Sequence, residues 1–191
     1  MKTSRCFVAL SISDEAVRNV RKLMAELERA EVDVKWVEKE NLHITLNFLG
    51  DLAPTETVAI CRAVSRSTEN LSPFDFELYE AGAFPKNSAP RSLWIGVGDG
   101  YEAVCELQQS ITDELIAMGY PPDTRKKFHP HLTLGRVKRS TTQLDILADL
   151  LGEHAHSSAG IVPAMEVLIY ASQLERNGPK YNIIGRSPLG G

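Results

Sequence analysis

The stretch Phe128-His129-Pro130-His131-Leu132-Thr133-Leu134-Gly135-Arg136 decides how this chain folds, because an earlier stretch repeats its centre. The earlier copy is Asn41-Leu42-His43-Ile44-Thr45-Leu46, and both copies contain the motif His-x-Thr-Leu. Residues i and i+2 of a β-strand project from the same face, so the histidine and threonine of each copy point together, and the apolar residues point the other way. Each copy therefore predicts a strand with one imidazole and one hydroxyl on its polar face.

The two copies lie 88 residues apart in a chain of 191 residues that has only five histidines. Their surroundings correspond at the same offset. The corresponding segments are Arg5–Leu10 with Leu93–Gly98, Asp14–Ala30 with Glu102–Met118, and Pro54–Ala63 with Thr142–Leu151. A repeat of pattern predicts two related structural units. We expect two lobes related by a pseudo-two-fold axis, each donating one His-x-Thr strand to a shared central groove; the alternative is an ordinary α+β domain with a chance coincidence.

The alternation of apolar and polar residues predicts an α+β fold of antiparallel strands with outer helices. Besides the second motif, the expected strands are Arg5–Ser11, Lys35–Val37, Asn41–Gly50, Phe74–Tyr79, Ser92–Val97, Ala164–Ala171 and Lys180–Ile184. We expect loops at Gly82–Pro85 and at Gly152–Gly160, and we expect Trp36 to anchor the first lobe. No linker divides the chain, so residues 1–191 are expected to form a single bilobal domain.

The composition is that of a globular protein, with 43% hydrophobic and 24% charged residues. A net charge of −4 argues against a general nucleic-acid coat, although it is compatible with a local basic site. Met1–Ala9 has no apolar stretch long enough for a signal peptide, and no segment approaches a membrane span. Cys6, Cys61 and Cys105 are widely spaced, which is typical of free thiols in a reducing compartment. We therefore expect a cytoplasmic protein without membrane association.

The second motif lies in a basic stretch, Arg125–Arg139, that contains no acidic residue. Its six positive residues are Arg125, Lys126, Lys127, Arg136, Lys138 and Arg139. In an acidic protein this stretch predicts an anionic ligand; the alternative is a solvated basic strand edge. Phosphate is the simplest anion that uses all the residue types present, since hydroxyl and guanidinium groups bind its non-bridging oxygens and imidazoles serve the attacking and leaving oxygens.

Two other kinds of site receive less support from the sequence. His129 and His131 share a strand face and could chelate a metal ion, but no Asp, Glu or Cys lies near them with ligand spacing. We therefore expect no metal site, and activity that survives chelation. The sequence has no Gly-x-Ser-x-Gly motif for a serine hydrolase and no P-loop for ATP-driven chemistry.

With these motifs the chain resembles the two-histidine (2H) phosphoesterase superfamily, and most closely the RNA 2′,3′-cyclic phosphodiesterases historically called 2′-5′ RNA ligases. The resemblance covers nearly the whole chain. The stretches that carry it are Arg5–Leu10, Asn41–Gly50, Gly82–Pro85 with Trp94, Pro130–Arg136, Tyr170–Ser172 and Gly178–Tyr181.

The resemblance implies hydrolysis of an RNA 2′,3′-cyclic phosphate end to a 2′-phosphate, without a metal or nucleotide cofactor. His43 would be the proton donor to the departing O3′, and His131 the proton acceptor from the attacking water. Thr45 and Thr133 would bind the non-bridging oxygens. An RNA 5′-hydroxyl in place of water would give 2′-5′ ligation. From the two motifs we expect ring nitrogens roughly 5–8 Å apart across one phosphate, and a bell-shaped rate profile with limbs around pH 6.5.

Arg136 is also an expected phosphate-binding residue, but it needs a further condition, because it lies five residues after His131 and strict alternation puts it on the opposite strand face. A bulge at Gly135 would return it to the groove.

Other functions stay open: an RNA-binding module with little turnover, or a sister enzyme that acts on small cyclic nucleotides, ADP-ribose cyclic phosphates or 2′-5′ oligoadenylates. Base recognition would use an aromatic residue such as Phe48 or Phe84, although we expect both in the core. The protein is expected to be a monomer.

Overall fold

The structure is a computed structural model that describes residues 3–120, 127–138, 144–175 and 178–190. The elements in chain order are β1 (Ser4–Ser11), α1 (Asp14–Glu28), β2 (Val34–Trp36), the short 3-10 helix η1 (Lys39–Asn41), β3 (His43–Leu52), α2 (Pro54–Thr68), β4 (Phe74–Phe84), β5 (Ser92–Val97), α3 (Tyr101–Ala117), β6 (His131–Val137), α4 (Leu144–Glu153), β7 (Ser158–Ala164), β8 (Glu166–Glu175) and β9 (Gly178–Pro188). This order confirms the expected α+β class.

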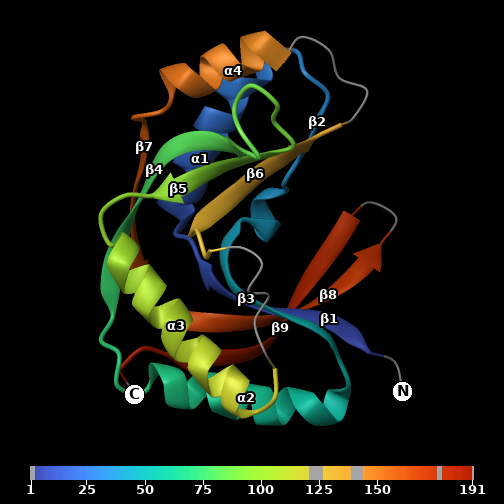
Figure 1. Cartoon of the computed structure of the whole chain (residues 1–191), viewed down its shortest axis with the longest axis vertical. Coiled ribbons are helices and arrows are strands. Elements are labelled where there is room, and N and C mark those ends of the chain that lie inside the picture. Colours follow the sequence, from blue (N-terminus) through green and yellow to red (C-terminus); the bar gives the residue numbers. More distant parts are fainter. Residues whose placement is uncertain (1–2, 121–126, 139–143, 176–177, 191) are drawn as a thin grey trace.

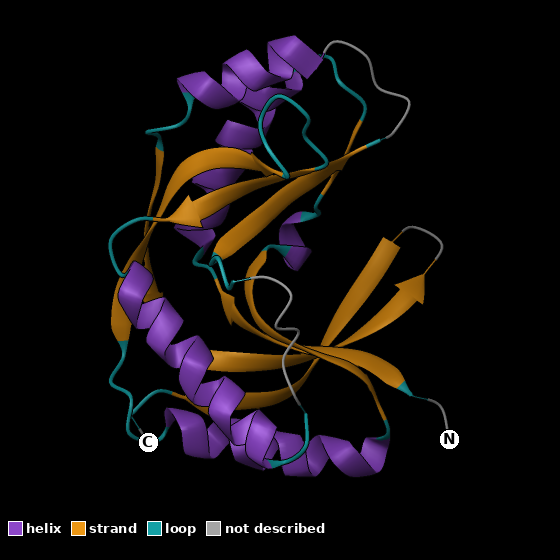
Figure 2. Ribbon diagram, viewed as in Figure 1, coloured by secondary structure: helices purple, strands orange, loops and turns teal. Residues whose placement is uncertain are grey.

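The strands form one curled antiparallel sheet in the order β7-β4-β5-β6-β3-β1-β8-β9, and β2 pairs with β6 beside this path. Figures 1 and 2 show that the sheet bends into two halves. We call the half with β1, β3, β8 and β9 the His43 lobe, and the half with β2, β4, β5, β6 and β7 the His131 lobe. The order of the main path is symmetric about its centre, because β3, β1, β8 and β9 correspond to β6, β5, β4 and β7.

The centre of this symmetry lies between the two motif strands. Ile44 of β3 pairs with Leu132 of β6, and these two residues are equivalent positions of the repeat. A residue can pair with its own equivalent only where a two-fold axis passes between the two strands. Both side chains are fully buried on the core face. The expected pseudo-two-fold arrangement of two lobes is therefore confirmed.

The helices interweave the two lobes. Helices α2 and α3 pack on each other and cover the His43 lobe through β9 and β3, whereas α1 packs on β7 and α4 packs on β4 of the His131 lobe (Figure 1). Helix α1 is capped by Ser13, whose hydroxyl accepts a hydrogen bond from the Ala16 amide at 3.2 Å. It follows β1 of the His43 lobe but buries its apolar face against the other lobe. No helix among residues 3–120, 127–138, 144–175 and 178–190 is long and apolar enough to cross a membrane.

Two expectations about the connecting segments are wrong. Trp36 does not anchor the first lobe, because β2 pairs with β6 and Trp36 lies over Gly135 of the His131 lobe. Gly82–Pro85 is not wholly a loop, because β4 continues to Phe84. Gly82 lies directly under the Trp94 ring, and a Cβ atom there would be 2.5 Å from Cζ2. This glycine is therefore required for packing rather than for a turn.

The edge strand β7 was not predicted, and part of it was assigned to the loop Gly152–Gly160. It contains Gly160, with φ of 99°, and Pro163, both of which normally break strands. Proline is tolerated in β7 because this strand is the last one in the sheet order and needs hydrogen bonds on one side only. The expected helix start at Thr142 lies outside the described residues.

Candidate active site

The first motif holds the His43 ring by a backbone contact. Nδ1 of His43 is 2.7 Å from the Asn41 carbonyl oxygen, so the Nδ1–H group donates to it, and Nε2 carries the lone pair in the neutral ring. Nε2 in turn lies 3.0 Å from the Thr45 hydroxyl, which can donate to it. The strand therefore fixes both the ring orientation and the nitrogen that is available for proton transfer.

The second motif repeats this arrangement. Nδ1 of His131 is 2.7 Å from the His129 carbonyl oxygen, again two residues upstream. The carbonyl oxygen selects the same tautomer, so Nε2 carries the lone pair in the neutral ring. The repeat therefore extends beyond the backbone path to the hydrogen bond that orients each imidazole.

The strand register brings the two motifs together on one face. Because Ile44 pairs with Leu132, His43 lies opposite Thr133. For the same reason Thr45 lies opposite His131. Diagonal neighbours across two strands have Cβ atoms roughly 7–8 Å apart. Besides burial, the positive charge of His131 lowers the pKa of His43. The expected separation of the ring nitrogens stays a prediction.

Aromatic side chains surround His43. The Phe7 ring stacks on it at a centroid distance of 4.8 Å, and Tyr181 meets it edge-on at 5.4 Å. Tyr170 lies 6.0 Å away. Burial in this environment lowers the pKa of His43 to about 4, although the hydrogen bond to the Asn41 carbonyl acts in the opposite direction. His43 is therefore neutral at pH 7 in the free protein.

His131 has a different set of neighbours. Phe84 meets its ring edge-on at 5.0 Å, and the Trp94 and His129 rings lie 6.5 Å and 6.3 Å away. Burial lowers the pKa of His131, the bond to the His129 carbonyl raises it, and the charge of His129 lowers it. Phe84 is only half-buried, so the expectation that it belongs to the core is only partly right.

A bulge in β6 decides where Arg136 points. Between Thr133 and Arg136, β6 advances three residues while its partner β5 advances two, from Trp94 to Ser92. Residues two apart on a regular strand share a face, so Ser92 lies on the face of Trp94. Arg136, opposite Ser92, therefore shares the face of Thr133. The difficulty raised by strict alternation is thus resolved by a bulge at the expected position.

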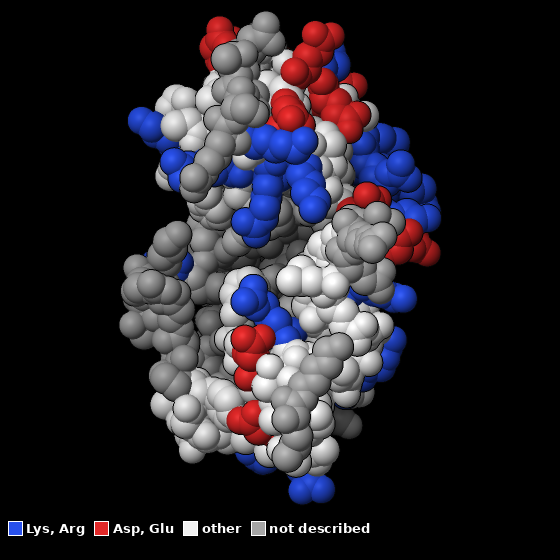
Figure 3. Space-filling model, turned by 90° about the vertical axis from the view of Figure 1, so that its right-hand side faces the viewer, with Lys and Arg blue, Asp and Glu red and all other residues white. Residues whose placement is uncertain are grey.

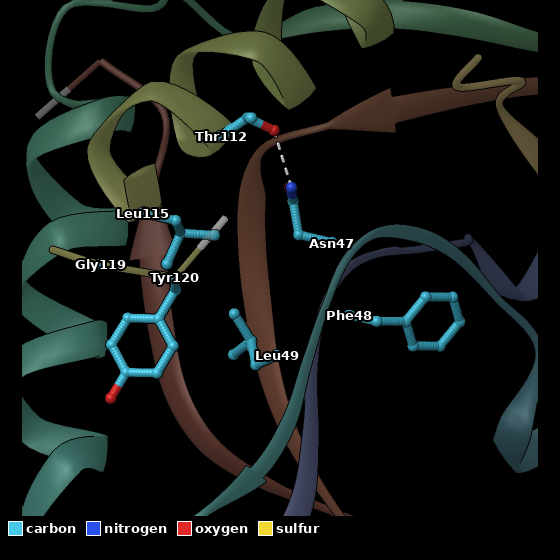
Figure 4. Close-up of a pocket in the computed structure, with 7 residues that line it drawn as sticks. All are labelled: Asn47, Phe48, Leu49, Thr112, Leu115, Gly119 and Tyr120. Carbon is cyan, nitrogen blue, oxygen red and sulfur yellow. Dashed lines mark hydrogen bonds between the residues drawn. The ribbon is translucent and has the colours of Figure 1, made fainter. Parts of the chain in front are cut away.

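The His43 lobe has the same bulge with a different side chain. From Thr45 to Phe48, β3 advances three residues while β1 advances two, from Ala9 to Phe7. Phe48 is thus the equivalent of Arg136, and it is 78% exposed, so the expectation that it lies in the core is wrong. Figure 4 shows its ring on the opposite side of β3 from Asn47.

A small pocket lies behind β3, away from the histidines. Its volume is about 140 Å³, and Leu49, Thr112 and Tyr120 contribute to its lining. The Asn47 side chain points into this region and donates to the Thr112 hydroxyl at 2.8 Å (Figure 4). Because the motif threonines and histidines project from the other face of the sheet, this pocket is separate from the candidate site.

The remaining histidines do not join the motif pair. His129 is exposed. His154 is half-buried, and its Nδ1 is within hydrogen-bond distance of the Ser157 hydroxyl, at 2.9 Å. His156 is exposed, and its Nδ1 lies 3.2 Å from the Tyr79 hydroxyl. Among the residues that the structure describes, no group of three His, Cys, Asp or Glu side chains could hold a metal ion.

The structure describes three of the six positive residues in the basic stretch Arg125–Arg139. Lys127, Arg136 and Lys138 are exposed, whereas the other three positive residues of the basic stretch, Arg125, Lys126 and Arg139, lie outside the described residues.

The cysteines, Cys6, Cys61 and Cys105, are free thiols, and burial raises the pKa of each. A raised pKa lowers the fraction of each thiol that is present as thiolate at neutral pH.

Sequence reasoning missed the aromatic neighbours of His43 and the position of Lys35. Phe7 carried a weak signal, since it lies in the first strand, on the face that alternation assigns to the groove. Tyr170 and Tyr181 come from the distant hairpin β8–β9 and reach His43 only because β8 pairs with β1. Lys35 lies opposite Arg136 because β2 joins β6. No local pattern predicts such long-range pairings.

The chain is similar to known proteins over nearly its whole length. The family model described as LigT like Phosphoesterase matches residues 10–94 and again residues 95–181. A relative named RNA 2′,3′-cyclic phosphodiesterase, from Methanothermobacter thermautotrophicus, is 34% identical over 93% of this chain and 94% of its own length. A crystal structure from Thermus thermophilus has a TM-score of 0.81 at 22% identity, with 98% of each chain covered. E. coli LigT, crystallised with phosphate, has a TM-score of 0.75 at 22% identity and full coverage of both chains.

Proposed function

Because the chain belongs to the LigT-like phosphoesterase family, we propose that it hydrolyses RNA 2′,3′-cyclic phosphate ends to 2′-phosphates. The observation that carries this proposal is the register of β3 and β6, which sets two identically oriented imidazoles and two threonine hydroxyls on one face. The names of the curated relatives supply the substrate class. One anion held between two imidazoles is the arrangement that this geometry supports best.

In the proposed reaction one bond forms and one breaks at phosphorus. Nε2 of His131 takes a proton from water as the water oxygen attacks, and the P–O3′ bond breaks. Nε2–H of His43 gives its proton to O3′, so that the product carries a 2′-phosphate and a free 3′-hydroxyl. Solvent then returns the proton from His131 to His43. If an RNA 5′-hydroxyl replaces the water, the same steps produce a 2′-5′ linkage.

The hydroxyls and Arg136 would stabilise the charge that develops on the phosphate. Thr45 and Thr133 lie across the strands from the two histidines, within the same face, and would donate to the non-bridging oxygens. Arg136 adds a guanidinium group on that face beyond Thr133. These groups are fixed by strands rather than by loops, so little reorganisation is needed as the reaction proceeds.

Both catalytic histidines come from one chain, which supports a monomer as the working unit. We propose that no metal or nucleotide cofactor takes part, since the chain itself supplies a proton donor, a proton acceptor and phosphate-binding groups. The free thiols of Cys6, Cys61 and Cys105 support a cytoplasmic location.

The two proton-transfer roles can be tested with a substrate whose bridging 3′-oxygen is replaced by sulfur. A thiolate leaves without a proton, so it removes the need for a general acid. On the ordinary cyclic phosphate, His43→Ala and His131→Ala should each lose a hundredfold or more in kcat. On the 3′-sulfur substrate, His43→Ala should recover most of its loss and His131→Ala should not. The double variant should lose far less than the product of the single losses.

The exposed His156 supplies the matched control, because His156→Ala should leave both rates unchanged. Wild-type turnover by His43→Ala on the oxygen substrate would refute the two-histidine mechanism. Rescue of His131→Ala in place of His43→Ala would instead reverse the two roles.

A further inference from the structure

Two positive side chains lie directly opposite each other on β2 and β6. Lys35 pairs in register with Arg136, and side chains at such positions have Cβ atoms about 4.5–5.5 Å apart. Like charges in this relation repel each other. Neither forms an ion pair with any residue in the described part of the chain, and the nearby acid Asp33 bonds Lys138 at 2.9 Å. In a protein of net charge −4, such a pair is suited to binding an anion.

The pair faces the groove. Arg136 shares the face of Thr133, and a directly opposite residue shares that face, so Lys35 does as well. Gly135 and Trp36, the next pair along, lie on the core face, where the glycine leaves room for the indole ring. Figure 3 shows Lys and Arg side chains gathered on the upper lip of a hollow between the lobes.

The position of β2 places Lys35 at the edge of the groove. Strand β3 pairs with β6 at Leu132 and then diverges from it. Strand β2 takes the same edge of β6 from Gly135 to Val137. Lys35 therefore stands where the two lobes separate. Across the groove, burial raises the pKa of Tyr181, and the charge of Arg136 is close enough to act on the same group in the opposite direction.

The distance from the histidines indicates which anion the pair would hold. Arg136 lies five residues beyond His131, one of which is taken up by the bulge, so the strand places them about 13 Å apart. The long arginine side chain can reach back towards a phosphate between the imidazoles. Lys35 lies beside Arg136 on the neighbouring strand, level with it along the sheet. When Arg136 binds the terminal phosphate, Lys35 is placed to bind a second phosphate next to it.

We propose that Lys35 binds the phosphodiester group on the 5′ side of the terminal nucleotide, beside Arg136, which binds the terminal cyclic phosphate. This inference rests on the proposed function and extends it, because it makes an RNA chain a better substrate than a nucleoside cyclic phosphate. Lys35 is then a residue that sets substrate length. The proton-transfer groups work equally on both substrates.

The test compares three substrates that differ in one charge. They are a nucleoside 2′,3′-cyclic phosphate, a dinucleotide ending in the same cyclic phosphate, and that dinucleotide with a neutral methylphosphonate linkage. Lys35→Gln should lower kcat/KM about tenfold on the ordinary dinucleotide, as loss of a charge-assisted hydrogen bond does, with little change in kcat. It should have no effect on the other two substrates. The salt dependence of dinucleotide binding should fall in slope by about 0.7.

Lys22→Gln is the matched control, because Lys22 is an exposed lysine on α1 that donates a hydrogen bond to its neighbour Asn19 at 3.5 Å. It should leave all three substrates unaffected. An equal loss on the phosphodiester and methylphosphonate dinucleotides would overturn the inference and indicate a structural role for Lys35. So would an unchanged rate on every substrate. Thermal unfolding of both variants checks that the fold is intact.

Failure of the proposed function gives a different result. In that case the wild-type protein hydrolyses none of the three substrates. Calorimetric binding of the 2′-phosphorylated dinucleotide product then tests Lys35 without turnover. Weaker binding by Lys35→Gln would support the second phosphate site, and unchanged binding would contradict it.

Discussion

The His43 lobe and the His131 lobe present different chemistry to the same groove from equivalent strand positions. Phe7 and Phe48, whose ring centroids lie 6.4 Å apart, form an aromatic pair on β1 and β3. In the other lobe the equivalent pair is Ser92 and Arg136, on β5 and β6. Strand β2 then adds Lys35 beside Arg136, whereas the His43 lobe instead receives Tyr181 from the hairpin.

The difference indicates how a repeated unit can divide its work. Both lobes keep the histidine, the threonine, the carbonyl contact to Nδ1 and the bulge that follows the motif. In the proposed mechanism these features serve proton transfer, which needs two similar groups. The residues after each bulge are not constrained in this way. One lobe therefore offers flat rings suited to a base, and the other offers cations suited to phosphates.

Substitutions of Phe48 and Arg136 test this difference between the lobes, and they are expected to have the largest effects on kcat/KM. Phe48→Ala should lower kcat/KM about tenfold on a nucleoside cyclic phosphate, since base stacking contributes about 1–3 kcal/mol. The loss should vanish on an abasic ribose 2′,3′-cyclic phosphate. Arg136→Gln should lower kcat/KM about tenfold or more on both substrates, because its partner is the phosphate.

Steady-state kinetics on the two substrates measure this contrast directly. Val58, another exposed apolar residue, provides the control variant Val58→Ala, which should behave as wild type on both. If Arg136→Gln lost activity only when a base was present, the proposed division between the lobes would be wrong.

A second difference between the lobes lies one residue before this pair, at Gly135 and its equivalent Asn47. Asn47 carries a side chain that reaches Thr112 of α3. At Gly135 an added Cβ would lie 2.6 Å from Val34 Cγ1 and 3.0 Å from Trp36 Cε3, because β2 covers this position. Gly135→Ala should therefore destabilise the protein by about 1–3 kcal/mol, the usual cost of overpacking.

Chemical denaturation measures this destabilisation. The control is Gly152→Ala in α4, where nothing lies within 4 Å of the added carbon. That variant should be neutral or gain up to about 1 kcal/mol of stability from helix propensity. Equal stability of Gly135→Ala and the wild type would show that β2 is not held against β6 by this contact. Lys35 would then not be positioned as described.

Local patterns in the sequence were sufficient for most of the fold and for the motif residues. The period-two alternation around His43 and His131 depends only on neighbouring residues, and the pairing of Ile44 with Leu132 follows from the repeat. The single offset of 88 residues was less accurate elsewhere. Ala9 lies opposite Thr45 as Trp94 lies opposite Thr133, so the first strands correspond at an offset of 85.

The features that sequence reasoning missed depend on long-range pairing or on the breaking of a pattern. The alternation in β4 stops at Tyr79 because a bulge follows, with Glu80 at φ of 67°. Which strand β2 would join could not be deduced from its three residues. Lys35 appeared as an ordinary exposed lysine for that reason. Its relation to Arg136 exists only in the assembled sheet.

The smallest expected effect is a shift in the pH dependence of activity. It tests how the surroundings of each histidine set its pKa. Burial lowers the pKa of His43 to about 4, and burial also lowers the pKa of His131 from the ordinary value of about 6.5. The proposed mechanism needs His43 protonated and His131 neutral, so protonation of His131 limits activity at low pH and loss of the proton from His43 limits it at high pH. Both limbs of kcat/KM, which report the free enzyme, should therefore lie below pH 6.5.

Bound substrate should move the profile in the opposite direction. A phosphate between the rings favours their protonated forms and raises both pKa values, so the optimum of kcat should lie at a higher pH than the optimum of kcat/KM. The two rings interact, so each limb belongs to the pair rather than to one residue. NMR titration of the imidazole C–H signals, with and without inorganic phosphate, measures the same shift in the absence of turnover. If the free His43 ring titrated near pH 6.5 and phosphate did not move it, the aromatic neighbours of His43 would not control its protonation. The contrast between an aromatic and a basic lobe would then concern binding alone.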